Sequence, residues 1–402
     1  MLSTTADPIR PEEAWRRLEP FLAPLPGEVV ARRRSWRRVL AAPLDARTDV
    51  PAHDVAAMDG YAVGPAPQPT LPVAATIAAG DAPGFELHPR TAVRIMTGAP
   101  VPEGADRVVP VELTDGGTER VVLRDGTPSG AHIRRRGEVV RAGQPLLATG
   151  TVVTPGALAT LATHGIPMVL VHRQPTVAVV TTGNEVVPPG VEPRSGQLRD
   201  SHTDFLLAAG RGLGLEFDSL GISADDPAVL AERISSGMRS DVLIVGGGVS
   251  MGAFDWVASV LERTGCELLF HNVAMQPGKP LLAARHAGGL VFGLPGNPNS
   301  VMATFSLFVR PALRRLLGYD DGFWRCATQG VLAGALPGAA ARDRFLPARL
   351  VAGDGPARLA PIAVRGSHDM NAFAAAQALI RIPAGSAPKA AGDPCSWQLL
   401  EP

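Results

Sequence analysis

DVLIVGGGVSMGAFD, at residues 241–255, is the stretch from which the architecture of this chain follows. An apolar run at 242–245 leads into three glycines, a loop of small residues and an aspartate at the start of an expected helix. A second loop, LPGNPNS at 294–300, also follows an apolar run and precedes a long helical pattern. Strand-to-helix turns of this kind can present backbone amides to anions. Two such turns predict a phosphorylated substrate.

The segment after Pro175 alternates strands with helices. We expect strands at 177–181, 217–222, 242–245, 268–271 and 290–292, and helices at 203–209, 228–236, 256–264 and 300–317. This alternation is typical of an α/β domain with a parallel sheet, helices on both faces and a ligand at the carboxyl ends of the strands.

Conspicuous polar and turn residues in this block come directly after predicted strands. They are Gly183, Asn184, Glu185, Asp225, Gly247, Gly248, Ser250, Asp255, Pro295, Gly296, Asn297, Pro298 and Ser300. Because the carboxyl ends of parallel strands converge, we expect these loops to surround one ligand. The alternative is that the glycines and asparagines only form tight turns.

A turn at 276–280, QPGKP, places Lys279 after Gly278 and between two prolines. The prolines limit backbone freedom, so the ammonium group could meet an anion at low entropic cost. A surface lysine in a turn is the alternative. Glu185, Asp225 and Asp255 on the same rim are candidates to hold Mg²⁺, although their spacing forms no metal motif.

Length and composition restrict the class of protein. A chain of 402 residues predicts two to four domains. Lys plus Arg equals Asp plus Glu at 38 each, which argues against a nucleic-acid or acidic-membrane partner. Three separated cysteines without a CxxC pair indicate buried free thiols in a reducing compartment. We expect a cytoplasmic protein, since no signal or membrane-spanning segment stands out.

The remaining segments predict further domains. Residues 49–136 carry short apolar runs separated by Pro, Gly and Asp, which predicts an inserted β-rich domain. Residues 11–22 have helical spacing, and the basic run at 32–38 predicts a second helix with a solvated face. The last eighty residues predict a small β module.

Several strings, taken together, match a known family. They are DVPAHDVAAMDGYAV (49–63), RIMTGAPVPEGADRVVPVE (94–112), TTGNE (181–185), RDS (199–201), GGVSMGAFD (247–255), QPGKP (276–280) and LPGNP (294–298). Over nearly its whole length the chain resembles the molybdopterin molybdenumtransferases, the bacterial molybdenum-insertion enzymes related to the E domain of gephyrin. The resemblance implies a helical and β linker domain at 1–48 with 137–173, the β-rich insertion at 49–136, an α/β molybdopterin-binding domain at 174–319 and a β-barrel-like domain at 320–402.

The resemblance also implies an activity. Family members insert molybdenum from molybdate into adenylylated molybdopterin and release AMP, assisted by Mg²⁺ or a similar divalent cation. It implies a homodimer in which the α/β domain of one chain faces the β-rich domain of the other. A molybdopterin adenylyltransferase is implied as the upstream donor of the substrate.

Site residues follow from the same resemblance. It assigns catalytic roles to Asp59, Thr97, Glu185, Asp225, Asp255 and Lys279. It assigns substrate contacts to Gly183, Asn184, Asp200, Ser201, Gly247, Gly248, Ser250, Gly278, Pro295, Gly296, Asn297, Pro298 and Ser300. Arg342 and Ser367 are implied molybdate contacts, and Glu185 and Asp255 are implied Mg²⁺ ligands. Without the resemblance, Asp59 and Thr97 would be taken as turn formers.

The chain departs from the family pattern at several positions. They are Ala52, His53, Val55, Ala56, His202 and Asn299. These departures leave open a divergent paralogue with altered substrate or lowered activity. Two further hypotheses are an adenylyltransferase that acts one step earlier and a non-catalytic scaffold, because a fold alone does not determine a function.

Overall fold

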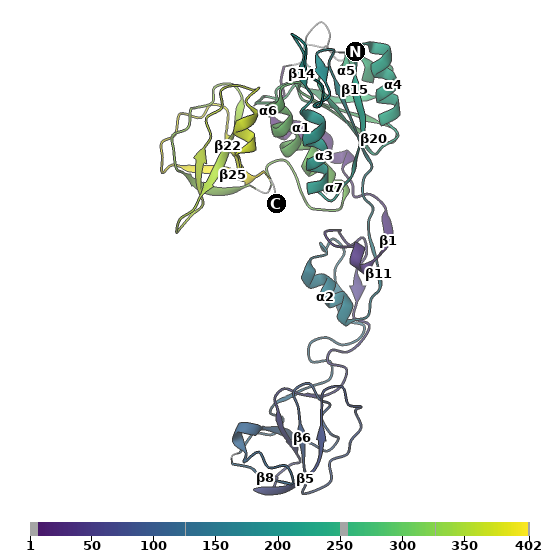
Figure 1. The fold of residues 1–402 in the computed structure, drawn as a ribbon, viewed down its shortest axis with the longest axis vertical. Coiled ribbons are helices and arrows are strands. Elements are labelled where there is room, and N and C mark those ends of the chain that lie inside the picture. The colour runs from purple at the N-terminus through teal and green to yellow at the C-terminus, as the bar shows by residue number, and fades with distance from the viewer. Residues whose placement is uncertain (1–6, 125, 250–255, 326, 401–402) are drawn as a thin grey trace. The chain divides into compact units, whose positions relative to one another are not determined.

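The computed structural model describes residues 7–124, 126–249, 256–325 and 327–400 (Figure 1). The chain forms two compact units. Unit 1 comprises the described residues of Met1–Val29, Arg37–Ala41 and Leu170–Pro402, and unit 2 comprises Val30–Trp36 and those of Ala42–Val169. The division into four domains stays a prediction.

A six-stranded sheet forms the centre of unit 1. Its strand order is β15-β12-β16-β20-β19-β17. The bounds are β12 Val177–Thr182, β15 Phe217–Ser223, β16 Val242–Gly246, β17 Glu267–His271, β19 Leu282–His286 and β20 Gly289–Leu294. The first four strands in this order are parallel, as predicted. Strand β19 was not predicted, and it runs antiparallel to both of its neighbours, so the sheet is mixed.

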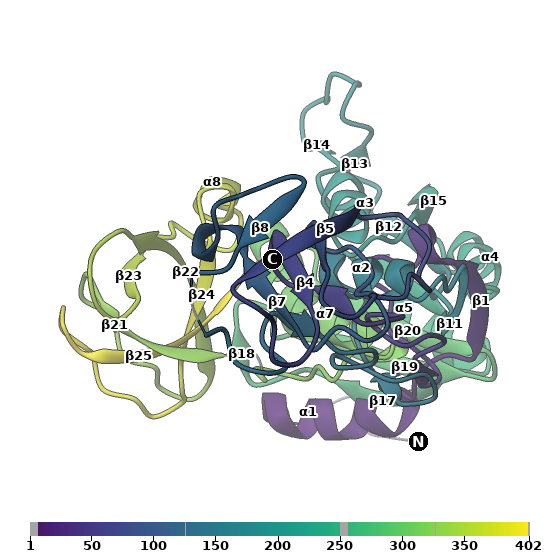
Figure 2. The same cartoon turned by 90° about the horizontal axis from the view of Figure 1, so that it is seen from below.

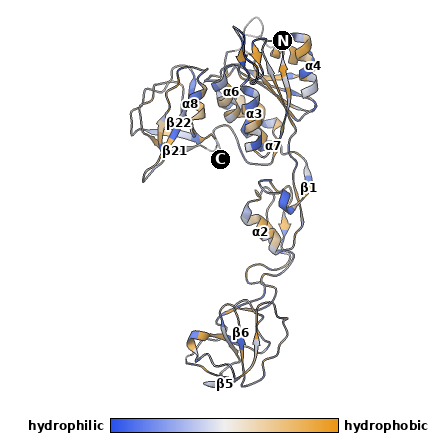
Figure 3. Cartoon of the chain, in the orientation of Figure 1, coloured by the Kyte–Doolittle hydropathy of each residue, from blue (hydrophilic) through white to orange (hydrophobic). Residues whose placement is uncertain are grey.

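The central strands are buried on both faces, which explains their continuous apolar sequences. Side chains of β12 alternate between two cores, with Val177 and Val179 on one face and Ala178 and Val180 on the other. Figure 3 shows hydrophobic residues concentrated in these strands. The sheet therefore packs on both faces, and the loops at its ends are the parts that can form a site.

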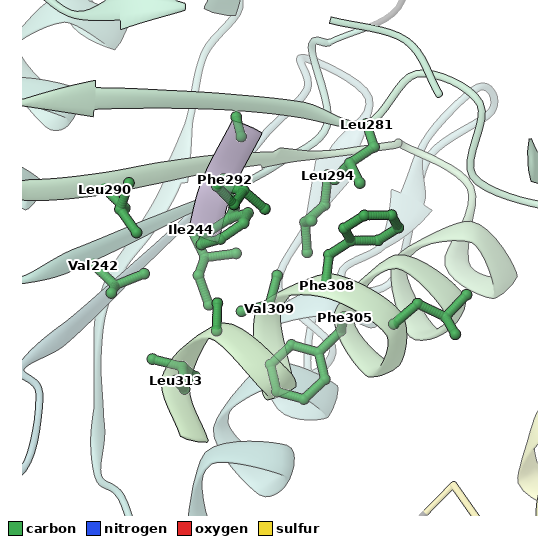
Figure 4. Packing of buried hydrophobic residues seen from close by; sticks show 14 of the residues in the cluster. Val242, Ile244, Leu281, Leu290, Phe292, Leu294, Phe305, Phe308, Val309 and Leu313 are labelled. Atoms are coloured by element: carbon green, nitrogen blue, oxygen red, sulfur yellow. The ribbon is translucent and has the colours of Figure 1, made fainter. Parts of the chain in front are cut away.

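Helices cover both faces of the sheet. They are α1 Pro11–Leu18, α3 His202–Gly212, α6 Pro298–Thr304 and α7 Arg310–Leu316 on one face, and α4 Pro227–Gly237 and α5 Val257–Arg263 on the other. Figure 4 shows the first layer, where Phe305, Phe308 and Val309 pack against Ile244 and Phe292 of the strands. The single helix predicted at 300–317 is interrupted by a π-helical segment, Phe305–Val309, between α6 and α7.

A five-stranded barrel forms the C-terminal part of unit 1. It consists of β21 Thr328–Leu332, β22 Asp343–Val351, β23 Arg358–Pro361, β24 Ala378–Ile382 and β25 Pro394–Leu399, with α8 Met370–Ala374 beside it. The order β22-β23-β21-β25-β24 closes through pairing of β24 with β22. The short strand β18 (Met275–Gln276) joins β22 in parallel. The predicted C-terminal β module is therefore a barrel.

A long loop leaves the α/β domain after β12. Strands β13 (Val186–Val187) and β14 (Leu198–Arg199) pair at its base, in parallel. Figure 2 shows the loop between them extending away from the sheet and helices.

Unit 2 contains a five-stranded sheet of order β7-β4-β6-β5-β8. The strands are β4 Gly60–Val63, β5 Thr70–Ile77, β6 Ala92–Ile95, β7 Arg107–Pro110 and β8 Arg120–Val122. This unit also holds α2 Pro155–Thr163 and two short paired strands, β3 Val55–Ala56 and β9 Ile133–Arg134. Outside these sheets, β1 Gly27–Ala31 pairs with β11 Met168–His172, and β2 Leu44–Asp45 pairs with β10 Pro145–Leu147.

The helix predicted at residues 32–38 is wrong. Only one 3-10 turn forms, at Arg32–Arg34. Arg37 has a φ of 61°, which ends any helix, and the buried Arg38 turns inward to contact Glu28 and the His172 carbonyl. Arg38 is therefore held by an ion pair with the exposed Glu28 and by a backbone acceptor, in place of the expected helix.

Two cysteines, Cys266 and Cys395, are buried free thiols, while Cys326 lies outside the described residues. In the part of the chain that the structure describes, no helix is long and apolar enough to cross a membrane.

Candidate active site

A cavity of about 890 Å³ opens at the carboxyl ends of β12, β15, β16 and β20. Residues of four strand-to-helix loops line it. They include Gly183, Asn184, Glu185, Asp225, Gly247, Gly248, Pro295, Gly296, Asn297, Pro298 and Ser300, together with Arg199, Asp200, Ser201 and His202 from the segment before α3. We call it the first cavity. It lies where a parallel sheet places its ligand.

Two of the loops are tied directly together at this cavity. The Asn184 amide donates to the Asp225 carboxylate at 3.0 Å, and the Asp225 amide donates to the Asn184 side-chain oxygen at 3.1 Å. A Cβ on Gly183 would lie 2.9 Å from a Glu185 carboxylate oxygen, so this glycine is needed for the carboxylate to fold back over the turn. The pairing fixes the β12 and β15 loops relative to each other.

Asp200 serves the fold of the site. One of its carboxylate oxygens accepts from the amides of His202 and Thr203, and the other accepts from the hydroxyls of Thr181 and Thr203. The carboxylate thereby caps the first turn of α3. The backbone charge of that helix end is consequently already neutralised by the protein itself.

His202 connects α3 with the β20 loop. Burial lowers the pKa of this imidazole, while the neighbouring Asp200 carboxylate and the Gly296 backbone act in the opposite direction. The neutral form is therefore favoured at neutral pH. His202 adds a hydrogen-bonding group to the wall without adding a full charge.

The glycines after β16 are packed against Thr182. A Cβ on Gly248 would lie 2.8 Å from the Thr182 hydroxyl oxygen, and the φ of Gly248 is +65°. That hydroxyl is buried, lines the first cavity and has no hydrogen-bond partner among the described residues. The amide of Gly247 donates to the Leu294 carbonyl at 2.9 Å, while the residue itself lines the first cavity.

A second cavity, of about 370 Å³, lies between the α/β domain and the barrel. Its described lining contains Lys279, Arg342 and Arg344 and no Asp or Glu. Gly278 and Ser367 also line it, and Pro280, Asn297 and Ser300 line both cavities. Two cavities of opposite charge character therefore share one wall.

Pairing between distant segments creates the second cavity. In the β18–β22 pair, Gln276 lies opposite Arg344, which brings the turn containing Lys279 to the barrel. A Cβ on Gly278, whose φ is +105°, would lie 2.6 Å from the Thr304 methyl group on α6. Only glycine allows this close approach of the turn to the helix.

Asn299 holds the opposite wall of the second cavity. Its amide donates to the Ser367 carbonyl at 3.1 Å, and its side-chain nitrogen donates to the Gly366 carbonyl at 3.0 Å. The residue is 1% exposed. Ser367 is thereby fixed beside the start of α6.

In unit 2, Asp59 and Thr97 form a local pair. Asp59 precedes β4 and Thr97 follows β6, and these strands pair antiparallel, which brings the two residues to the same end of the sheet. The amide and the hydroxyl of Thr97 donate to one Asp59 oxygen at 2.6 and 2.7 Å. These two bonds, the amide first, lower the pKa of Asp59, so its carboxylate stays charged at neutral pH.

The structure thus distributes the predicted site residues over three places. The first cavity collects the α/β loop residues, the second collects Gly278, Lys279, Arg342 and Ser367, and unit 2 holds Asp59 and Thr97. Ser250 and Asp255 lie outside the described residues. The single crevice expected for Lys279 and Glu185 is replaced by two adjoining cavities.

The lining residues that sequence reasoning missed include Thr182, Arg199 and Arg344. Thr182 and Arg199 each stand inside a string that we had singled out, so adjacency to Gly183 and to Asp200 was a usable signal. Arg344 gave no such signal, because its position depends on the pairing of β18 with β22.

The described residues contain no group of three or more His, Cys, Asp and Glu side chains that could hold a metal ion. Glu185 and Asp225 still supply carboxylates to the first cavity. Mg²⁺ usually binds one or two carboxylates together with substrate phosphates and water, so this donor set fits a substrate-assisted Mg²⁺ site.

Family models cover the chain in three parts. Residues 9–165 match the MoeA N-terminal region (domain I and II), residues 178–315 match a probable molybdopterin binding domain, and residues 329–400 match the MoeA C-terminal region (domain IV).

Individual relatives match over almost the full length. Molybdopterin molybdenumtransferase 2 of Mycobacterium tuberculosis is 37% identical over 88% of this chain and 90% of its own. Molybdopterin molybdenumtransferase of Bacillus subtilis is 35% identical over 94% of this chain and 91% of its own. The names of these relatives favour neither the adenylyltransferase nor the scaffold hypothesis.

A solved structure has the same fold. The molybdopterin biosynthesis MoeA protein from Pyrococcus horikoshii superposes with a TM-score of 0.83 at 30% identity, over 98% of this chain and 100% of that one. Full-length sequence relatives, all three family models and this superposition agree, and the chain belongs to the molybdopterin molybdenumtransferase (MoeA) family.

Proposed function

We propose that this protein inserts molybdenum from molybdate into adenylylated molybdopterin and releases AMP. One observation carries the proposal: a large cavity with carboxylates and a small cavity with three cations share a wall formed by Pro280, Asn297 and Ser300. A bulky pterin nucleotide and a small oxyanion would then lie side by side. The names of the full-length relatives support the same reaction.

The second cavity suits molybdate, a tetrahedral dianion. Lys279, Arg342 and Arg344 supply positive charge, and Ser300 and Ser367 supply hydroxyls, in a lining without Asp or Glu. Charge-assisted hydrogen bonds of this type are the strong ones, and a partly enclosed site strengthens them further. The first cavity then holds the pterin nucleotide, with its dithiolene toward the shared wall.

The reaction balances without a redox partner. Water adds to a phosphorus of the phosphoanhydride, the bridging P–O bond breaks, and AMP leaves. Two Mo–S bonds form while one molybdate oxide departs as water with the two thiol protons. The residues of the two cavities bind and orient the two substrates, which converts a bimolecular step into one within a complex.

Mg²⁺ fits the first cavity through Glu185 and Asp225 together with substrate phosphate oxygens. When bound, it would neutralise charge on the phosphates. The two carboxylates would hold the cation, and the reciprocal hydrogen bonds between Asn184 and Asp225 fix the position of the Asp225 carboxylate.

The proposal includes a homodimer in which Asp59 and Thr97 act on the site of the partner chain. Coexpression of an Asp59→Ala chain with a Lys279→Ala chain tests this, because each heterodimer would keep one intact site. We expect recovered molybdenum insertion in the mixture. Activity no higher than that of the two separate variants would contradict shared sites.

The activity itself is tested with adenylylated molybdopterin and molybdate. We expect AMP release that depends on molybdate. Consumption of ATP with formation of adenylylated molybdopterin would instead indicate an adenylyltransferase, and neither reaction would indicate a scaffold.

A further inference from the structure

The first cavity has an unfavourable charge for a nucleotide. Glu185, Asp200 and Asp225 contribute carboxylates to its described lining, and Arg199 is the only Lys or Arg there. Residues 250–255, which lie outside the described part, are SMGAFD and contain neither. A substrate phosphate in this cavity therefore has one side-chain cation available from the lining.

Backbone amides do not supply the missing charge at the described helix starts. Asp200 already occupies the amides of His202 and Thr203 at α3. At α6, Pro298 has no N–H, and the amides of Asn299 and Ser300 donate to the carbonyls of Ser367 and Asn297. Beside any bound Mg²⁺, Arg199 is therefore the side-chain cation that the described lining offers to a phosphate.

Arg199 is held at the cavity by the base of the long loop between β13 and β14. The Leu198 amide donates to the Glu185 carbonyl, and the Asp200 amide donates to the Val187 carbonyl, both at 2.8 Å. The backbone on either side of Arg199 is therefore hydrogen-bonded to Glu185 and Val187, at the start of β13 and within it. Its backbone is fixed while its side chain remains 48% exposed.

The guanidinium of Arg199 is paired with Glu192 of the same loop. One nitrogen of Arg199 lies 2.7 Å from a carboxylate oxygen of Glu192, whose side chain is 89% exposed. An ion pair this open to water contributes little stability. A phosphate dianion offers two or three oxygens to the planar fork of an arginine, so it competes well with such a partner.

We propose that Arg199 binds the phosphate of the nucleotide in the first cavity and that Glu192 is an internal competitor which this phosphate displaces. The inference rests on the proposed function, because it assumes that the cavity takes a nucleotide. Glu192 thereby weakens nucleotide affinity and favours release of AMP after the reaction.

AMP titration by calorimetry, with the full chain and Mg²⁺, tests the exchange. We expect Arg199→Gln to weaken AMP binding about tenfold or more. We expect Glu192→Gln to tighten it by about two- to fivefold, because the competitor is gone. In the Arg199→Gln background, Glu192→Gln should have no effect on affinity.

Arg194→Gln is the matched control. Arg194 is exposed in the same loop, carries the same charge and is not among the lining residues. We expect its substitution to leave AMP affinity within twofold of wild type. Melting temperatures of all variants should agree, because Arg199 and Glu192 are exposed and an ion pair this open to water contributes little stability.

Different results separate this inference from the proposed function. Wild-type protein that binds AMP, with unchanged affinity in Arg199→Gln or no tightening in Glu192→Gln, overturns the exchange and leaves the function intact. Wild-type protein that fails to bind AMP at millimolar concentration overturns the nucleotide cavity and the exchange together.

Discussion

The two cavities differ in how their charge arises. The first lies at the ends of strands that are adjacent in the sheet, and the turns after them supply its carboxylates. The second depends on a two-residue pairing between β18 and β22, which brings Lys279 to Arg342 and Arg344 from the barrel. The comparison teaches that a site formed by loops at one edge of a parallel sheet can be predicted from the sequence. A cationic pocket that depends on pairing between two strands far apart in the chain cannot.

The largest expected effect concerns the second cavity alone. Lys279→Ala removes one of its three cations, and we expect molybdate-dependent turnover to fall by about 10²–10³-fold. AMP affinity should stay at the wild-type value, because Lys279 does not line the first cavity. Turnover with varied molybdate and calorimetry with AMP measure the two effects.

The control for this experiment is Lys389→Ala. Lys389 is the other lysine of the chain, and it is half-buried on the barrel, where its ammonium donates to the Pro394 carbonyl. We expect no change in turnover. Equal losses in both variants would show that general charge, rather than a built anion site, matters.

A smaller effect should distinguish the Mg²⁺ requirement of the first cavity from molybdate binding in the second. Glu185→Gln removes a carboxylate, so we expect the Mg²⁺ concentration for half-maximal activity to rise by about tenfold. The affinity for molybdate should not change. Glu232→Gln, on the exposed surface of α4, is the matched control. An unaltered Mg²⁺ dependence in Glu185→Gln would remove this residue from the metal site.

Gly278→Ala tests the packing that holds the second cavity together. The new methyl group would meet Thr304, and the positive φ would be strained, so we expect the free energy of unfolding to fall by roughly 1–3 kcal/mol. Urea denaturation measures this change. Gly296→Ala is a suitable comparison, since a Cβ there meets no atom within 4 Å, and similar losses in both would contradict the argument.

The smallest effect is a pH dependence in the first cavity. Burial lowers the pKa of His202, so the unfolded chain binds a proton on this residue more readily than the folded one. Its contribution to stability is therefore fully present above the unfolded pKa of about 6.5 and is lost as the pH falls below it. His202→Gln should reduce the loss of stability between pH 7.5 and 5.5, measured by urea denaturation.

Much of the sheet could be predicted from the sequence, because strands such as 177–181 and 242–245 are continuous apolar runs bounded by turn residues. Strand β19 was missed because LAARH carries no comparable signal. The run at 32–38 was predicted as a helix because its charges suggested a solvated face, whereas the tertiary contacts of Arg38 determine its conformation.

The candidate site divides in the same way. Asn184 and Asp225 were predicted together, since both follow parallel strands, and they bond to each other. The position of Lys279 in a separate cavity could not be predicted, because no local sequence signal indicates the pairing of Gln276 with Arg344. Arg199 was overlooked because the substrate contact in the RDS motif was assigned to its neighbour Asp200. The Asp200 carboxylate mainly accepts hydrogen bonds from backbone amides at the start of α3.

The π-helical segment at Phe305–Val309 has a consequence for how this protein can evolve. Before it, α6 carries Asn299 and Ser300 on cavity walls, and after it, α7 packs Leu313 into the core. Each residue turns an α-helix by about 100°, so removal of one residue here would rotate one half relative to the other. The wide turn therefore sets the rotation of the cavity-lining residues of α6 relative to the core-packing residues of α7. A one-residue deletion there would abolish activity without replacing any side chain that meets a substrate.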